Sequence, residues 1–176
     1  TLNSSKRSVS GVTLIELVIT IVLISIAIAG VVGGFSLVVG RSADTLFQSR
    51  TTAIGQAYLD EILSRRFDKD TPTGGVPPTK NCHKRDLTTD PNSGDRPALT
   101  AVEQFHGLKD KPPRRIDDEG DNTDWPGYDG YEVTVEVKCA GSEVGLSNND
   151  DAKRIDVTVT PPQGPEMVFT AYRGNF

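Results

Sequence analysis

The sequence has few of the side chains that enzymes and metal centres use. Its 176 residues include only two cysteines and two histidines, and these four residues lack the closely spaced pairs of a typical zinc site. Cys82 and His83 are adjacent, with His106 and Cys139 farther along the chain. Adjacent side chains in a loop do not define a nucleophile and its base. We therefore expect no enzyme active site, no cofactor and no bound metal.

Sustained basic runs and a second long apolar run are also missing. The chain carries 19 basic and 24 acidic residues, which gives a net charge of -5. This balance argues against nucleic acid as an obligate partner. Because the sequence has no second long apolar run, any membrane anchor should be a single span. About 135 residues beyond it would suffice for one modest globular domain.

The most prominent feature is the apolar run from Gly11 to Val39, in which Glu16 is the only charged residue. From Leu17 onward it has about 23 uncharged residues, enough to cross the roughly 30 Å hydrocarbon core as a helix. Lys6 and Arg7 precede the run. The positive-inside tendency then predicts a cytoplasmic N-terminus, with the rest of the chain on the outer side.

Glu16 needs a partner or a polar location, because a carboxylate in hydrocarbon costs about 2.5–3.5 kcal/mol on insertion scales. If the chain is cut after Gly11, the new amine of Val12 lies about one helical turn from Glu16 and can pair with it, in the same or a neighbouring subunit. Alternatively, the run is an ordinary signal anchor, and Glu16 lies at the headgroup level, where the helix N-terminus tolerates it.

The motif Gly-Val-Thr-Leu-Ile-Glu-Leu at residues 11–17, preceded by basic residues, resembles the class III leader of type IV pilins and pseudopilins. The resemblance implies that residues 1–11 are a leader removed by a prepilin peptidase between Gly11 and Val12. It also implies N-methylation of Val12 and a role for Glu16 in docking other pilin subunits. Val12 departs from the family, in which Phe or Met is usual at this position.

The amphipathic sequence beyond the apolar run predicts that the helix continues outside the membrane. Apolar residues recur at helical spacing, and the stripe consists of Phe47, Ile54, Tyr58 and Ile62 with Leu63 and Phe67 beside it. We expect a transmembrane half over residues 12–40 and an amphipathic half over residues 41–67. A periplasmic globular region should then occupy residues 68–176.

Within that region the pattern changes from turns to strands. Residues 70–127 are rich in Pro, Gly and Asp and predict an irregular segment with one short element near residues 99–108. Alternating residues then predict strands over 131–140, 154–160 and 167–172. We expect an antiparallel meander packed on the aqueous half of the helix, and hence an α+β, type IV pilin-like fold.

Two groups of residues in the outer region have candidate chemistry. Cys82 and Cys139 should form a disulfide in an oxidising periplasm, closing about 57 residues and adding about 4 kcal/mol in the chain-entropy model. An acidic cluster could supply oxygen ligands to calcium, but it does not match an EF-hand loop, and a solvated surface loop is the better interpretation. The cluster consists of Asp117, Asp118, Glu119, Asp121, Asn122 and Asp124.

A second resemblance lies beyond the leader. Residues 56–68, 107–113 and 152–162 and the terminal Tyr-Arg-Gly-Asn-Phe are similar to minor pilins of the mannose-sensitive haemagglutinin (MSHA) type IV pilus. This implies a structural subunit that starts or caps a filament used for surface attachment, with other pilins, prepilin peptidase and the bacterial inner membrane as partners. Two alternatives stay open: a minor pseudopilin of a type II secretion system, and a membrane-anchored periplasmic binding module that never polymerises.

Overall fold

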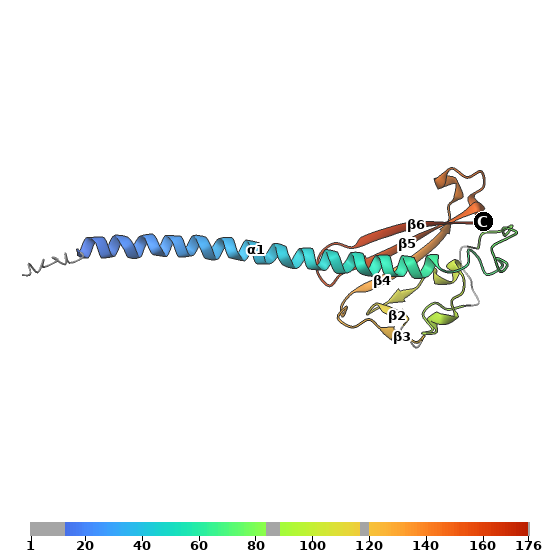
Figure 1. Ribbon diagram of the computed structural model, residues 1–176, viewed down its shortest axis with the longest axis horizontal. Coiled ribbons are helices and arrows are strands. Elements are labelled where there is room, and N and C mark those ends of the chain that lie inside the picture. The colour runs from blue at the N-terminus through green and yellow to red at the C-terminus, as the bar shows by residue number, and fades with distance from the viewer. Residues whose placement is uncertain (1–12, 84–88, 117–119, 176) are drawn as a thin grey trace, which may run out of the picture. The chain divides into compact units, whose positions relative to one another are not determined.

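The computed structural model describes residues 13–83, 89–116 and 120–175, with the backbone alone for residues 37–45. The chain divides into two compact units, Thr1–Thr45 and Leu46–Phe176. A single long helix, α1 (Leu14–Leu63), supplies the described part of the first unit and the opening element of the second. The expected α+β class is confirmed, with a long N-terminal helix and an antiparallel sheet (Figure 1).

The main sheet has four antiparallel strands in the order β1-β4-β5-β6. These strands are β1 (Lys109–Asp110), β4 (Glu132–Cys139), β5 (Ala152–Thr160) and β6 (Met167–Gly174). Val133, Val135 and Val137 of β4 face Val159, Val157 and Ile155 of β5 across the ladder, and all six are buried. Successive strands thus present their β-branched side chains to one face, and the predicted meander is confirmed.

One face of α1 covers this apolar side of the sheet. Ile54, Tyr58 and Ile62 recur every four residues and are at most 1% exposed, while Phe47 and Leu63 pack at the margin. A second group of apolar residues from the irregular segment completes the core, consisting of Leu99, Val102, Phe105 and Leu108. The predicted stripe on the helix is therefore the surface around which the outer unit folds.

The segment before β4 is more ordered than its composition suggests. It contains the short 3₁₀ helices η1 (Arg96–Ala98) and η2 (Val102–Phe105) and a separate hairpin of β2 (Arg114–Ile116) with β3 (Asn122–Asp124). The strand β1 also joins the main sheet through β4, an addition that the sequence did not predict. A two-residue strand has too few residues to show alternation.

The helix ends three or four residues earlier than we expected, at Leu63. The backbone of Arg66 pairs elsewhere, since its N–H donates to the carbonyl of Thr100 and its own carbonyl accepts from Val102. The two hydrogen bonds, at 3.2 and 3.0 Å, replace those that another helical turn would make. Phe67 therefore enters the core from a loop, where it is 3% exposed.

A buried arginine fastens the irregular segment to α1. The guanidinium of Arg96 is 1% exposed, lies 4.3 Å from the ring centroid of Tyr58 and pairs with Glu61 at 2.8 Å and with Asp110 at 2.6 Å. The Tyr58 hydroxyl donates to Asp110 at 2.6 Å and accepts from the Arg114 N–H at 2.8 Å. Burial raises the pKa of Tyr58 above its ordinary value, so the phenol stays a donor at neutral pH.

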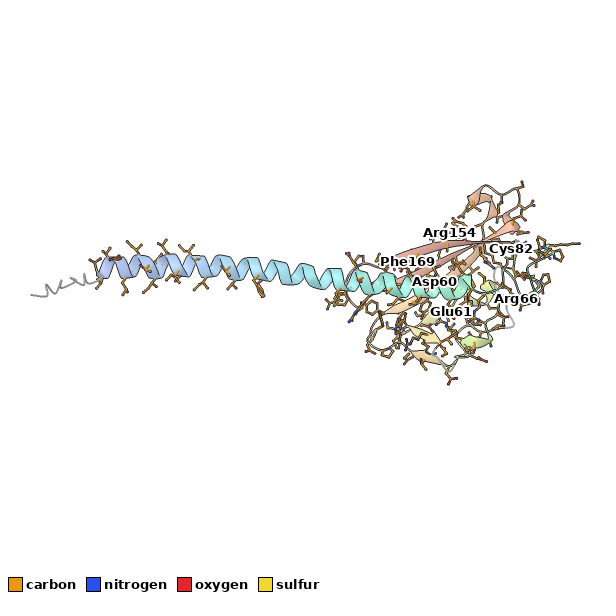
Figure 2. The ribbon with its side chains drawn as sticks, in the orientation of Figure 1. Asp60, Glu61, Arg66, Cys82, Arg154 and Phe169 are labelled. Carbon is orange, nitrogen blue, oxygen red and sulfur yellow. A yellow bond between two sulfur atoms is a disulfide. The ribbon has the colours of Figure 1, made fainter. Side chains whose placement is uncertain are left out.

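Gly55 marks the closest approach of α1 to the sheet. It is buried, and a Cβ atom added there would overlap the ring of Phe169 on β6 (Figure 2). In an isolated helix, Gly→Ala stabilises by about 0.5–1 kcal/mol. Here the contact with Phe169 should outweigh that gain, because overpacking a core costs about 1–3 kcal/mol.

Gly55→Ala should therefore destabilise the outer unit, although alanine is the better helix former. Urea unfolding of the full chain in detergent, followed by the fluorescence of the single tryptophan, Trp125, measures the effect. The matched control is Gly55→Ala in a Phe169→Ala background, where the ring is gone and alanine should be neutral or stabilising. Equal effects in both backgrounds would contradict the close contact.

Candidate functional site

The N-terminal turn of α1 places Glu16 at the start of the apolar helix. Thr13 precedes the helix, and its hydroxyl oxygen accepts from the Glu16 N–H at 3.4 Å, while its carbonyl accepts from the Leu17 N–H at 3.2 Å. An acidic residue in the first turn interacts favourably with the helix dipole. Gly11 and Val12, the predicted cleavage and methylation positions, lie outside the described residues.

The Glu16 carboxylate has no hydrogen bond or ion pair with any described residue. The hydrogen bonds of Glu16 are made by its backbone, through Thr13 and through the Thr20 hydroxyl, which donates to the Glu16 carbonyl at 2.6 Å. A carboxylate that has no such contact can pair with a cation from outside the described chain. The structure thus leaves Glu16 free for the predicted pairing without showing the partner.

The apolar part of α1 buries nothing within the described chain. Residues Leu14–Ser36 have a mean hydropathy of 2.8 and none of them is buried, and their large apolar side chains are 47–83% exposed. Figure 2 shows these side chains standing out around the helix. Since soluble monomers rarely expose a contiguous apolar patch above a few hundred Å², this surface requires a lipid or protein environment. By length and composition the helix can cross a membrane.

The polar side chains within this span satisfy their own hydrogen-bond donors. The hydroxyls of Thr20, Ser25 and Ser36 each donate to the carbonyl four residues earlier, at 2.6, 2.8 and 3.0 Å. In hydrocarbon an unsatisfied polar group costs several kcal/mol, so internal pairing removes this penalty. The hydroxyl groups of the described span are therefore compatible with a lipid environment.

Gly30, Gly33 and Gly34 give the same helix a surface without side chains. A Cβ atom at any of them would meet no heavy atom within 4 Å in the described chain. No intrachain contact among the described residues therefore requires glycine at these positions. Small residues at these positions permit the close approach of another helix.

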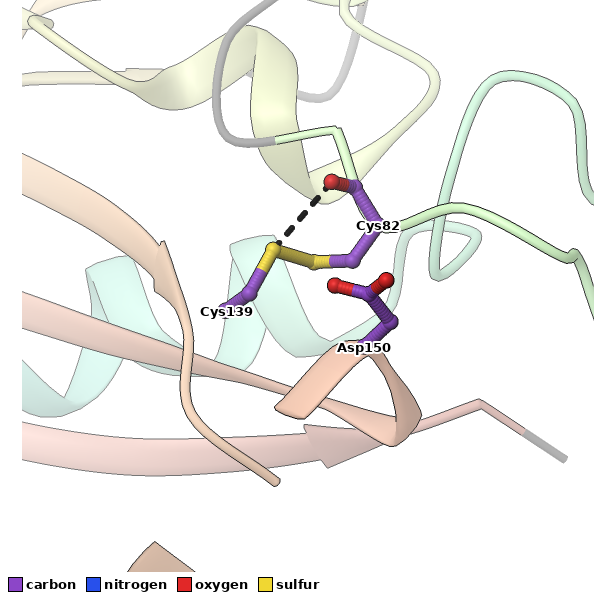
Figure 3. Close-up of side chains that lie close together, drawn as sticks. All are labelled: Cys82, Cys139 and Asp150. Carbon is purple, nitrogen blue, oxygen red and sulfur yellow. Dashed lines mark hydrogen bonds between the residues drawn. A yellow bond between two sulfur atoms is a disulfide. The ribbon is translucent and has the colours of Figure 1, made fainter. Parts of the chain in front are cut away.

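The predicted disulfide between Cys82 and Cys139 is present, with a Cα–Cα distance of 6.1 Å. It ties the loop after α1 to the end of β4, and Asp150 lies beside it (Figure 3). The Cys139 sulfur also contacts the Cys82 carbonyl oxygen at 3.2 Å. Because the two sulfurs are bonded to each other, neither is a thiolate that could hold zinc. His106 accepts from the Val137 N–H at 3.0 Å, so its ring serves the fold.

His83, the remaining zinc candidate, joins a buried charge cluster built around Asp68. The His83 ring nitrogen Nδ1 lies 2.9 Å from Asp68, and the Lys153 ammonium lies 2.9 Å from Asp68 and 2.7 Å from Glu103. The side chains of Lys153, Asp68 and Glu103 are all 0% exposed. Lys153 also donates to the Phe67 carbonyl at 2.7 Å, which uses its third proton. This geometry is that of a satisfied ion cluster, although Asp68, Asp70 and His83 lie close enough to hold a metal.

Sequence reasoning missed this cluster, although a signal was present. Lys153 lies at an inward position of β5, in the same alternation as Ile155, Val157 and Val159. A lysine on the apolar face of a strand must be paired, because an unpaired buried charge is strongly unfavourable. The sequence could not identify the acids, since Asp68 and Glu103 lie 85 and 50 residues away.

The described part of the acidic cluster is engaged in the fold. The side-chain amide of Asn122 donates to the Gly94 carbonyl at 3.2 Å, and Asp124 accepts from Arg114 at 3.1 Å across the β2–β3 hairpin. Asp117, Asp118 and Glu119 lie outside the described residues. The Oδ1 atom of Asn122 is buried without a hydrogen-bond partner in the described chain, so the choice between a solvated loop and a calcium site stays a prediction.

The Asp68 carboxylate should make stability depend on acid pH. Burial alone would raise its pKa, but hydrogen bonds from Lys153 and His83 outweigh this effect and hold the pKa at about 2, below the ordinary 3.8. A lowered folded-state pKa gives stability that is complete above pH 4 and lost as the pH falls toward 2. The unfolding free energy of wild type should therefore exceed that of Asp68→Asn above pH 4, and the difference should shrink toward pH 2.

Equilibrium urea unfolding at several pH values between 2 and 6 measures this difference. Asp60→Asn, which removes an exposed carboxylate from α1, is the matched control. A difference between wild type and Asp68→Asn that stayed constant from pH 6 to pH 2 would contradict a lowered pKa.

Comparison with known proteins gives one match. A family model described as the prokaryotic N-terminal methylation motif covers residues 6–32. No curated protein and no solved structure matches the chain. The matched residues include Lys6 and Arg7, Glu16 and most of the exposed apolar helix. The motif indicates a type IV pilin-like or pseudopilin-like protein, a class of structural subunits that prepilin peptidase cleaves and that assemble with other pilins.

Proposed function

We propose that the protein is a minor pilin of a type IV pilus of the MSHA kind, similar to MshD, and that it helps to start or cap a filament used for surface attachment. The observation that carries the proposal is the continuity of the methylation motif with an apolar helix that buries nothing in its own described chain. A subunit of this kind has an exposed helix that other subunits can cover.

The same helix suits two environments in succession. In the first, Leu14–Ser36 spans the bacterial inner membrane with the N-terminus in the cytoplasm and residues 46–176 in the periplasm. In the second, the helix leaves the lipid and packs with the equivalent helices of other pilins. No new folding is needed, because the hydroxyl groups of the span are already paired internally.

Cleavage between Gly11 and Val12 would create the cation that Glu16 needs. The new amine of Val12 lies four residues before Glu16, and an ammonium paired with a carboxylate in a dry environment forms a strong charge-assisted hydrogen bond. The partner can be the amine of a neighbouring subunit, which would select the register of docking. N-methylation of Val12 keeps this positive charge.

The two alternatives differ in the fate of the chain after insertion. A minor pseudopilin of a type II secretion system would carry the same processed N-terminus, but would co-purify with a secretion machine rather than with sheared pili. A membrane-anchored binding module that never polymerises would keep residues 1–11. Processing at Gly11 therefore separates both filament subunits from the anchored module.

The leader should be a substrate for prepilin peptidase. Mass spectrometry of the chain from peptidase-positive cells should find a mature N-terminus at Val12 carrying one methyl group. Gly11→Ala should be cleaved in part, because alanine is nearly as small, whereas Gly11→Leu should block cleavage. Retention of Lys6 and Arg7 in the mature wild-type protein would rule out this processing.

Glu16 should act in assembly and not in folding. Glu16→Ala should insert, be cleaved and form its disulfide normally, because no described contact joins the Glu16 carboxylate to the outer core. Its recovery with sheared pili or with other minor pilins should fall about tenfold or more, since a hydrogen bond to a charged group is worth about 1.5–3 kcal/mol.

The measurement is quantitative co-purification at matched expression, with Glu166→Ala as control. Glu166 is an exposed glutamate in the outer unit, so its loss tests for a general effect of removing one negative charge. Equal recovery of Glu16→Ala and wild type would mean that Glu16 merely lies at the headgroup level.

A further inference from the structure

A cavity of about 260 Å³ opens where α1 ends, and three arginines line it. Arg65 and Arg66 come from the residues after α1, and Arg173 comes from the end of β6. Figure 2 shows Arg66 at this end of the helix. The remaining lining is neutral, consisting of Ser64, Phe67, Thr71, Pro72, Gly74 and Gly75. No carboxylate is among the described lining residues, so the cavity is positively charged.

Arg173 is the least compensated of the three. Its Nε atom is buried and has no hydrogen-bond partner in the described chain. Directly opposite it on the neighbouring strand is Lys153, so two cations face each other across the ladder. Like charges in this position are destabilising. Lys153 forms ion pairs with Asp68 and Glu103, and neither of these acids lines the cavity.

The positive charges of Arg65 and Arg66 are also incompletely neutralised within the described chain. The Nε of Arg65 is buried without a partner among the described residues, and its guanidinium approaches Glu61 only at 3.7 Å. Glu61 already pairs with Arg96 at 2.8 Å, so one carboxylate serves two arginines. The hydrogen bonds of Arg66 go to neutral oxygens, the Thr71 carbonyl at 3.3 Å and the Thr100 hydroxyl at 3.2 Å.

Buried donors without acceptors are rare in folded proteins, and each costs about 1–3 kcal/mol. Three guanidiniums around one cavity, with no carboxylate in its described lining, also point to an acceptor that is bound from outside. Planar guanidinium forks match the oxygens of carboxylate, sulfate and phosphate groups in bidentate pairs. We propose that this cavity, lined by Arg65, Arg66 and Arg173, binds a small oxyanion group.

The size of the cavity restricts the ligand. Its volume is that of about nine water molecules at roughly 30 Å³ each, and lies below the range of about 300–1,000 Å³ typical of sites for drug-sized ligands. It therefore accommodates one charged group with a few waters. That group can be a free anion or the carboxylate of an acidic sugar in a polysaccharide, and both present the same oxygens to the arginines.

Calorimetric titration of the full chain in nonionic detergent tests the proposal. The probes are sodium sulfate, sodium phosphate and trigalacturonate, with ionic strength held constant by sodium chloride. At least one probe should bind wild type, and Arg173→Gln or Arg65→Gln should weaken that binding about tenfold or more, as expected for one lost charged hydrogen bond. Tighter binding of trigalacturonate would identify a pendant sugar carboxylate, and tighter binding of sulfate or phosphate a free anion.

Arg115→Gln is the matched control, because it removes an exposed arginine from β2, outside the cavity. Binding that Arg115→Gln weakens as much as Arg173→Gln, or no binding by any probe, would overturn the proposal and leave an adventitious ion only. Without anion, the melting temperature of Arg173→Gln should equal or exceed that of wild type, since the repulsion from Lys153 is relieved. A large fall would give the guanidinium a structural role instead and would also overturn the proposal.

Discussion

The exposed apolar half of α1 is the strongest physical constraint on where this chain can exist. None of the residues Leu14–Ser36 is buried within the described chain. At about 1.5–3 kcal/mol for each large apolar side chain, leaving this helix in water would cost on the order of 20 kcal/mol. That exceeds the roughly 5–15 kcal/mol by which a whole domain is stable. The helix must therefore be covered, and either lipid or the helices of other subunits can cover it.

The outer unit holds together without that cover because its own core is complete. Ile54, Tyr58 and Ile62 close one face of the sheet, and Gly55 lets the helix approach β6. Outside the sheet, buried ion clusters and a disulfide hold the loops in place. Arg96 secures the irregular segment to α1, and Lys153 secures the loop after it. These interactions do not involve Leu14–Ser36, so residues 46–176 should keep one structure whatever covers that part of the helix.

Periodicity in the sequence predicted the parts of the fold that repeat. The valines of β4 and β5 and the stripe around Tyr58 have regular spacing, so their burial could be expected from the pattern alone. The end of the helix, β1 and the cavity could not be predicted, because they depend on pairings across long sequence separations. Arg66 leaves the helix to pair with Thr100, and Arg173 meets Arg65 only when β6 is in place.

Two features of the candidate site could be predicted without periodicity. The Cys82–Cys139 disulfide was predictable because the chain has only two cysteines, both on the expected outer side of the membrane. Glu16 was identified by its chemistry, as the only charge in an apolar run. The partner of Glu16 could not be inferred from residue spacing in the same way, because pairing with a neighbouring subunit depends on assembly.

Crosslinking from within the apolar helix can show whether lipid or other pilin subunits cover it. A photoreactive amino acid at Val22, which is 52% exposed, reports what covers the helix. In cells that express the chain without other pilins, we predict adducts with lipid. In cells that assemble filaments, we predict adducts with other pilin subunits in the sheared fraction. Adducts exclusively with residues 46–176 of the same chain, in both kinds of cell, would contradict the claim, because the helix would then be covered by its own protein.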